Sequence, residues 1–303
     1  MTTDSPDRAL QAAHAAPARD IPPGLHFVST PIGAARDITL RALDLLAGAD
    51  VLAAEDTRSL RHLMEIHGVA LKERPLVPYH EHNEAQALPR LMRALQEGKS
   101  VAYASEAGTP LISDPGFGLA RAAIAEGLPV LAAPGASAVL CALTVSGLPS
   151  DRFFFAGFAP SAKAARRRFL SDLARVDATL ILYESPKRIR ETLAECVQVF
   201  GDERRGAVCR EMTKRFEEIT RGSLTDLVAA YEGRDVKGEI VLLIDRGAVV
   251  QADPQTVEAA LDRAMETMSV KDAAAAIADA YGIARREVYQ LALTRGRSEK
   301  DEG

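Results

Sequence analysis

The stretch Ser105-Glu-Ala-Gly-Thr-Pro-Leu-Ile-Ser-Asp-Pro-Gly116 decides the fold of this chain. It follows a β-type run at Ser100–Ala104 and precedes a helical pattern that starts near Phe117. A strand, a Gly/Pro-rich loop and a helix in this order form a ligand-binding corner of an open parallel sheet. Ordinary strand-to-helix loops have about 2–6 residues, so a long ordered loop without a ligand is the less favoured alternative.

The same loop carries the side chains that a binding site needs. Glu106 and Asp114 supply two carboxylates, and two serines supply hydroxyls. Gly108 and Gly116 admit backbone angles that other residues avoid, which lets a ligand approach the main chain closely. We therefore expect this loop to form one wall of a functional site.

Composition and charge limit the class of protein. The 303 residues, 47% hydrophobic and 26% charged, predict a folded α/β protein of about two domains with an appendage. The net charge of −5 excludes a basic nucleic-acid coat, so any RNA contact must come from local basic patches. No apolar run is long enough to predict a membrane span. Residues 1–23 have no apolar core segment and are expected to form a disordered tail.

Three cysteines are widely spaced among apolar neighbours: Cys141, Cys196 and Cys209. Such a pattern favours buried free thiols over a disulfide or a metal site. Free thiols indicate a reducing compartment, so we expect a cytoplasmic protein.

Residues 24–150 are predicted to form a first α/β domain. Three further corners place Gly, Pro or charged residues directly after a strand: Thr30-Pro-Ile-Gly33 after Leu25–Ser29, Glu55-Asp-Thr-Arg58 after Asp50–Ala54, and Pro134-Gly-Ala-Ser137 after Val130–Ala132. In a parallel sheet the carboxyl ends of the strands share one edge, so these corners should converge on one crevice.

Helix starts in this domain follow from capping residues. Asp37 is expected to cap the helix that ends at Gly48, and Asp56 or Thr57 the helix that comes next. Asn83 is expected to cap a later helix, and His80 to line a rim. A metal site at His80 and the histidine two residues on is not favoured, because no third ligand is placed to complete it.

Residues 151–248 are predicted to form a second α/β domain, with antiparallel elements in its sheet. Its expected strands are Arg152–Ala156, Thr179–Tyr183, Ala207–Arg210, Phe216–Thr220 and Glu239–Ile244. Residues 161–190 hold eight basic and three acidic residues, a local net of +5. This patch is equally consistent with polyanion binding and with a solvated helix face.

Residues 252–303 are predicted to form a small helical appendage. Its three helical patterns are Thr256–Met268, Val270–Tyr281 and Arg285–Arg295. Ser269 should cap the second, and the second and third together resemble a helix-turn-helix with a basic edge. A packing appendage is favoured over DNA contact, because helix pairs of this kind are common.

Separate motifs occur here in an order shared by one family: Thr30-Pro-Ile-Gly33 with Asp37-Ile-Thr-Leu40, Ala54-Glu-Asp-Thr-Arg58, Ser105–Gly116, Pro134-Gly135, Tyr183-Glu-Ser185 and Arg210-Glu-Met-Thr-Lys214. From Leu25 onward the chain resembles the small-subunit (16S) ribosomal RNA cytidine 2′-O-methyltransferases, within the tetrapyrrole-methylase-like enzymes. It departs from the usual pattern at Ala34, where Asn is common, and at Glu106, where Asp is frequent.

The resemblance implies two α/β domains with S-adenosylmethionine in the cleft between them, a homodimer, and no metal. The substrate it implies is a decoding-centre cytidine of the small ribosomal subunit, methylated on its ribose 2′-hydroxyl. Catalysis would need alignment of the reacting atoms and a base for the hydroxyl proton.

Roles for individual residues come from the same resemblance. Glu106 is the first candidate for the base, Glu184 the second and His80 the third. Residues expected to hold or orient the donor are Pro31, Gly108, Thr109, Asp114, Pro134, Ala136, Met212 and Thr213. Residues expected to bind RNA phosphates are Arg58, Arg166, Arg167, Arg168, Lys187 and Arg188.

Two rival functions remain open on the sequence alone. A methyltransferase of the same fold could act on a tetrapyrrole precursor, although the basic patch and the helical tail argue against it. Alternatively, residues 252–303 could be a DNA-binding module and the rest a sensor, which the acidic net charge disfavours.

Overall fold

The computed structural model describes residues 20–246, 254–281 and 285–301. The chain separates into two compact units, Met1–Arg246 and Gly247–Gly303. The predicted tail at residues 1–23 lies almost wholly outside the described residues.

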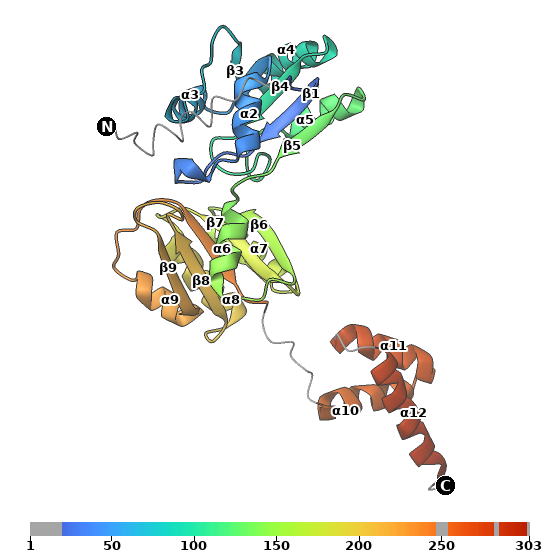
Figure 1. Ribbon diagram of the computed structural model, residues 1–303. Coiled ribbons are helices and arrows are strands. Elements are labelled where there is room, and N and C mark those ends of the chain that lie inside the picture. The colour runs from blue at the N-terminus through green and yellow to red at the C-terminus, as the bar shows by residue number, and fades with distance from the viewer. Residues whose placement is uncertain (1–19, 247–253, 282–284, 302–303) are drawn as a thin grey trace, which may run out of the picture. The chain divides into compact units, whose positions relative to one another are not determined.

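The first unit begins with a five-stranded sheet in which every strand is parallel to its neighbours, in the order β3-β2-β4-β1-β5 (Figure 1). Its strands are β1 (Gly24–Val28), β2 (Val51–Ala54), β3 (Leu76–Pro78), β4 (Ser100–Ala104) and β5 (Val130–Ala133). The three inner strands are buried throughout, as expected where helices cover both faces. The parallel sheet and the common edge for the predicted corners are confirmed.

Helices cover both faces of this sheet. They are α2 (Leu40–Gly48), α3 (Thr57–Ile66), α4 (Glu84–Gln96) and α5 (Phe117–Ala125), preceded by the short 3-10 helix η1 (Ala35–Asp37). Leu91 of α4 and Leu119 of α5 pack with Tyr103 on one face, whereas Leu46 of α2 packs with Leu52 on the other. Alternate residues of each strand therefore enter two separate cores.

The first unit continues with a second five-stranded sheet, ordered β6-β7-β10-β8-β9. Its strands are β6 (Phe153–Phe158), β7 (Thr179–Glu184), β8 (Arg205–Arg210), β9 (Glu218–Ser223) and β10 (Ile240–Ile244). Only β6 and β7 pair in parallel, and the other pairs are antiparallel as predicted. The pairing of β6 with β7 shifts register between Phe155 and Gly157.

Four helices accompany the second sheet: α6 (Ala138–Ser146), α7 (Lys163–Leu173), α8 (Ile189–Phe200) and α9 (Leu224–Tyr231). Leu170, Leu193 and Leu227 of the last three pack on one face, and Leu143 of α6 packs on the other. The predicted domain junction at residues 150–151 lies beyond α6, although α6 packs on the second sheet. The part of the unit built on the first sheet is the first lobe, and the part built on the second sheet is the second lobe.

Two of the predicted caps are wrong in detail. Thr39, rather than Asp37, accepts a hydrogen bond from the Ala42 N–H and caps α2. Asn83 precedes α4, but its side chain bonds backwards, accepting from the His80 N–H. Asp56 caps α3 as predicted, because its carboxylate accepts from the first backbone N–H groups of that helix.

The second unit holds three helices, α10 (Pro254–Met265), α11 (Val270–Tyr281) and α12 (Arg285–Asp301). Leu261, Ile277 and Val288 bring the three together in one small core. Ser269 accepts a hydrogen bond from the Asp272 N–H at the start of α11, as predicted. Among the described residues, the helices are too short or too polar to cross a membrane.

Candidate functional site

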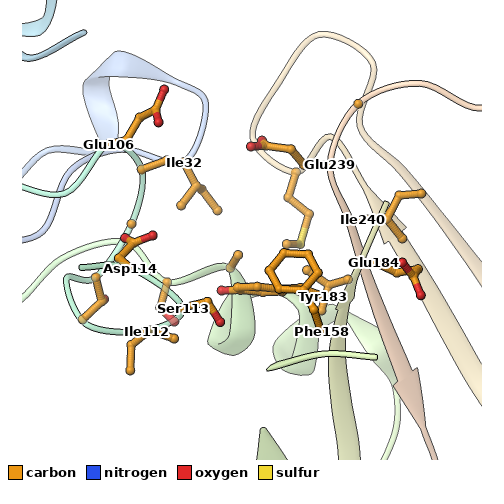
Figure 2. A pocket seen from close by; sticks show the side chains of 18 of the residues that line it. Ile32, Glu106, Ile112, Ser113, Asp114, Phe158, Tyr183, Glu184, Glu239 and Ile240 are labelled. Carbon is orange, nitrogen blue, oxygen red and sulfur yellow. The ribbon is translucent and has the colours of Figure 1, made fainter. Parts of the chain in front are cut away.

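A cleft of about 480 Å³ lies between the loops of the two lobes (Figure 2). This volume is within the range of about 300–1,000 Å³ that small-molecule sites occupy. Its walls combine apolar side chains with carboxylates and exposed backbone. The residues that line it include Ile32, Glu55, Glu106, Gly108, Thr109, Ile112, Ser113, Asp114, Phe158, Tyr183, Glu184, Met212, Glu239, Ile240 and Val241.

Hydrogen bonds tie the loop at residues 105–116 to the neighbouring corners of the first sheet. Thr30 and Gly108 exchange both backbone hydrogen bonds, each at 3.0 Å. The Ser105 hydroxyl donates to the Gly108 carbonyl at 2.6 Å, and the Thr109 hydroxyl donates to the Ala136 carbonyl at 3.0 Å. The loop is therefore an ordered wall joined to the corners at Thr30 and Ala136, and Glu55 of the remaining corner also lines the cleft.

The same loop presents Asp114 from a strained backbone. Leu111 and Ser113 have φ values of 72° and 61°, in the left-handed region that side chains other than glycine rarely occupy. Asp114 Oδ2 is buried and has no hydrogen-bond partner. Burial, together with the negative charges of Glu55 and Glu106, raises the pKa of Asp114 to about 7. A strained loop that holds an unpaired carboxylate in a cleft is typical of a functional site.

Other carboxylates make the cleft acidic on both sides. Burial raises the pKa of Glu55, with further contributions from Glu106 and Glu81. Burial raises the pKa of Tyr183 to about 12, assisted by the charges of Asp114 and Glu239. Because the charge of Asp114 in the first lobe acts on Tyr183 in the second, the two walls share one electrostatic environment. Such a cleft suits a positively charged ligand.

Glu184, the second candidate for the base, is engaged in structural interactions. Its side chain is fully buried, and Arg188 donates to Oε1 at 2.6 Å and 2.8 Å. The Ser185 N–H also donates to Oε1, and the Thr192 hydroxyl donates to Oε2 at 2.6 Å. These donors occupy both oxygens of the carboxylate, so the structure argues against a role for Glu184 as a proton acceptor.

A close contact between the backbone of the first lobe and side chains of the second joins the two lobes beside the cleft. The Ala34 N–H donates to the Thr213 hydroxyl at 3.1 Å. A Cβ added at Gly33 would lie 2.6 Å from both Thr213 Oγ1 and Lys214 Cγ. Only glycine allows this approach, which explains the glycine of the first corner. Thr213 has φ 60°, so the second-lobe loop is also strained where it makes the contact.

The predicted donor-site residues divide into two groups. Those that line the cleft are Gly108, Thr109, Asp114 and Met212, and those that do not are Pro31, Pro134, Ala136 and Thr213. Glu106 lines the cleft and is exposed. The sequence prediction missed Ile32, Ile112, Phe158, Tyr183, Ile240 and Val241 as lining residues. Ile32, Ile112 and Tyr183 lie inside the quoted motifs, which could have marked them, whereas Phe158, Ile240 and Val241 lie in strands of the second sheet that no motif marks.

His80, the third candidate for the base, is not among the lining residues. Its Nδ1 is buried without a hydrogen-bond partner, and its ring makes an edge contact with His82 at 6.0 Å between centroids. His80 lies near enough to Glu55 to oppose the rise in the pKa of the Glu55 carboxyl. Within the described residues, no group of three or more His, Cys, Asp or Glu side chains is arranged to hold a metal ion.

The residues predicted to bind RNA fall into two groups, those engaged in structural contacts and those exposed to solvent. Arg166 is 2% exposed and bonds Ser161 and Glu191, so its inclusion was wrong: α7 turns this side chain inward. Arg188 is the partner of Glu184, and therefore is not available either. The exposed cations of the predicted set are Arg58, which pairs with Asp56, together with Arg167, Arg168 and Lys187, which form no salt bridge with another described residue.

Comparisons with known proteins agree with this geometry. Residues 24–228 match the family model of Tetrapyrrole (Corrin/Porphyrin) Methylases, and residues 251–296 match that of the RsmI C-terminal HTH domain. A uroporphyrin-III C-methyltransferase from Thermus thermophilus, complexed with S-adenyl homocysteine, shares the fold with a TM-score of 0.51. The two are 19% identical over 73% of this chain and 96% of that one. The fold and cleft therefore define a methyltransferase of the tetrapyrrole methylase class.

Named relatives identify the family within this class of methyltransferases. The ribosomal RNA small subunit methyltransferase I of Mesorhizobium japonicum is 45% identical over 91% of this chain and 94% of its own. The protein of the same name from Haemophilus influenzae is 41% identical over 89% of this chain and 96% of its own. The chain belongs to the ribosomal RNA small subunit methyltransferase I family. The family resemblance of the sequence motifs and the helix-turn-helix at the C-terminus are thereby confirmed.

Proposed function

We propose that this chain transfers a methyl group from S-adenosylmethionine to the ribose 2′-hydroxyl of a cytidine in the decoding centre of small-subunit ribosomal RNA. One observation of the site carries the proposal: Asp114, whose carboxylate oxygen Oδ2 is buried without a partner, lines a cleft that both lobes build. The names of the relatives supply the substrate class.

The residues of the cleft fit this donor. Its sulfonium and amino groups are positive, and Glu55, Glu106 and Asp114 surround the cleft with negative charge. Its adenine is flat and apolar on both faces, and the apolar side chains of Ile32 and Met212 line the same space. When bound, the donor supplies a methyl group on a positively charged sulfur that leaves as a neutral thioether.

Asp114 is placed to take the proton of the 2′-hydroxyl. During methyl transfer the hydroxyl proton would pass to the Asp114 carboxylate. A pKa near 7 suits this task, because about half of the groups are ionised at neutral pH and the protonated product is stable. Glu106, the first candidate from the sequence, is the alternative base, because it also lines the cleft and is more exposed to solvent.

The RNA would be held outside the cleft by exposed cations. Arg167, Arg168 and Lys187 supply positive charge without an acidic partner among the described residues. The helix-turn-helix unit is a further candidate for contact with the ribosomal particle. Phosphate contacts of this kind make binding strongly dependent on salt concentration.

Activity assays separate this proposal from action on a tetrapyrrole. The purified protein is incubated with methyl-labelled S-adenosylmethionine and either small subunits from cells that lack the enzyme or a porphyrin precursor. We expect label in the RNA at one cytidine, with resistance of the adjacent bond to alkali, because a 2′-O-methyl group blocks alkaline cleavage. Label in the porphyrin alone would overturn the proposal.

The cytoplasmic location and a homodimer complete the proposal. Helix α5 presents Phe117 and Ile124 two turns apart at 64% and 63% exposure, and a second copy would cover such apolar side chains. Light scattering of the purified chain should give the mass of a dimer. A monomer mass at micromolar concentration would remove the dimer from the proposal.

A further inference from the structure

A large aromatic side chain stands exposed at the cleft, outside the acidic group that serves the methyl donor. Phe158, the last residue of β6, is 56% exposed and lines the cleft. Single exposed apolar residues are common on protein surfaces and need no explanation. An exposed ring at the opening of a cleft that must admit a substrate is different, because it supplies a flat apolar surface at the point of entry.

The position of Phe158 results from a break in the pairing of β6 with β7. Phe155 pairs with Ile181, Gly157 with Leu182 and Phe158 with Tyr183, so one residue of β6 is extra. Gly157 has φ 69°, a conformation that a bulge requires and glycine permits. Side chains alternate along a strand, so an extra residue moves every later side chain to the opposite face. Phe158 is thereby placed on the face of Tyr183.

Ring contacts support the side chain in this position. Tyr183 lies edge-on to Phe158 at 5.5 Å between centroids, and also edge-on to Phe155 at 4.8 Å. Such edge contacts are favourable arrangements of aromatic rings. Tyr183 is half-buried between its neighbours. The ring of Phe158 is therefore braced on one side by a fixed neighbour and remains largely open to solvent.

An apolar side chain of the first lobe lies on the opposite side of the cleft. Ile112 is 39% exposed and belongs to the same loop as Asp114. A Cβ added at Gly157 would lie 3.9 Å from Ser113 Oγ, so this loop runs beside the bulge. Figure 2 shows Phe158 and Tyr183 on one side, and Ile112, Ser113 and Asp114 on the other. Asp114, the candidate base, lines the same cleft on the side of Ile112.

We propose that Phe158 stacks on the base of the target nucleotide, with Ile112 closing its other face, so that the attached ribose meets Asp114. This inference rests on the proposed function. Sequence-specific RNA recognition uses splayed bases that stack on aromatic side chains, and enzymes that modify a nucleotide take it out of its helix. Phe158 is a positioning residue, because it touches the base and not the reacting atoms.

The adenine of the donor is the other nucleobase that could stack on Phe158. The exposure of the ring favours the RNA base, because small-molecule sites bury most of their ligand, whereas an RNA nucleotide enters from the solvent side. Experiment separates the two possibilities. Removing the ring lowers the affinity for the donor in the absence of RNA only if the ring stacks on the donor adenine.

The test compares Phe158→Ala, Phe158→Leu and Phe158→Tyr with a matched control, Phe154→Ala. Phe154 lies on the same strand at 45% exposure, but its side chain is on the opposite face, and it does not line the cleft. For each variant, KM and kcat are measured with undermethylated small subunits, and the affinity for S-adenosylmethionine is measured by calorimetry without RNA. Thermal unfolding checks that each variant folds.

We expect Phe158→Ala to raise KM for the particle by about 5–150-fold, the range for loss of one stacked base. Phe158→Leu should recover little of this loss, because it restores apolar volume but no flat surface, whereas Phe158→Tyr should recover most. Donor affinity should stay within about twofold of wild type in all of them, and Phe154→Ala should behave as wild type.

Other outcomes would overturn the inference. A parallel loss of donor affinity would mean that the ring contacts the donor adenine. Equal KM values for Phe158→Ala and Phe154→Ala, or full recovery by leucine, would mean that no base stacks there. If the wild-type protein binds donor but methylates no small subunit, the proposed function fails and this inference fails with it. Wild-type methylation with unchanged KM in Phe158→Ala refutes the stacking alone.

Discussion

Replacing Asp114 by asparagine tests the assignment of the base most directly. The two side chains have nearly the same shape, but asparagine carries no charge and accepts no proton at neutral pH. Asp114 Oδ2 has no hydrogen-bond partner to lose, so the substitution leaves the surrounding structure intact. Two quantities should change: the dependence of stability on pH, and the rate of methyl transfer.

The stability effect can be worked out from the pKa. Burial and the charges of Glu55 and Glu106 raise the pKa of Asp114 from 3.8 to about 7. The folded protein then holds a proton that the unfolded chain releases, so wild-type stability falls as pH rises from about 4 to 7. At about 1.4 kcal/mol per pH unit the full effect is on the order of 4 kcal/mol, and contact of the cleft with solvent reduces it.

Asparagine removes this dependence. The unfolding free energy of Asp114→Asn relative to wild type should therefore increase by about 1–3 kcal/mol between pH 5 and pH 8. Urea unfolding at the two pH values measures it, with Glu106→Gln as the matched control. Glu106 is a second carboxylate of the same cleft but is exposed, so its replacement should show a smaller increase.

The catalytic effect is measured by rapid quenching of a single turnover, with donor already bound and small subunits in excess. The wild-type rate should rise with pH and level off above the pKa of about 7, because only the ionised carboxylate accepts a proton. Asp114→Asn should be slower by about 10²–10⁴-fold and lose this inflection. A rate within about threefold of wild type would refute the assignment, as would an inflection near pH 7 that survives the substitution. A comparable loss in Glu106→Gln alone would restore the base role to Glu106.

Three further predictions concern the supporting structure. Glu184→Gln leaves the Arg188 charge without its partner and should lower the unfolding free energy by about 2–4 kcal/mol, as measured in urea; unchanged stability would contradict the pairing. Arg167→Glu with Arg168→Glu should raise KM for the small subunit several-fold and flatten its dependence on salt, while calorimetry finds donor affinity unchanged; an equal loss of donor affinity would count against this role. Gly33→Ala should force the lobes apart and weaken donor binding about tenfold or more by calorimetry, and normal affinity would show that the contact is adaptable.

Local chemistry in the sequence was enough to predict the corners and their convergence. A parallel sheet places the carboxyl ends of its strands along one edge, so a motif that comes directly after a strand is located as soon as the strand is recognised. Glu106, Gly108 and Thr109 could therefore be assigned to the cleft without coordinates, and the structure places all three there. The short strand Leu76–Pro78 was not recognised, because three residues show no periodicity.

The state of each charged group could not be predicted in this way. Glu184 ends one strand and Asp114 follows another, but Arg188 and Thr192 donate hydrogen bonds to the first, whereas Oδ2 of the second is buried without a donor. Arg166 has the same charge as the arginine next to it, yet the phase of α7 turns Arg166 inward. Burial and hydrogen-bond partners depend on how each side chain points in the folded chain, and these decide whether a charge is available for function.

By itself, the sequence determined the two α/β domains, the family, and the loop that forms the first wall of the cleft. Each of these depends on local backbone preference and on motifs that are contiguous in the chain. Only the tertiary structure decided that Asp114 Oδ2 is buried without a partner and that Phe158 lines the cleft. The position of Phe158 depends on one extra residue in β6. The pairing of β6 with β7, and not the residues of β6 alone, determines which side of the sheet the ring occupies.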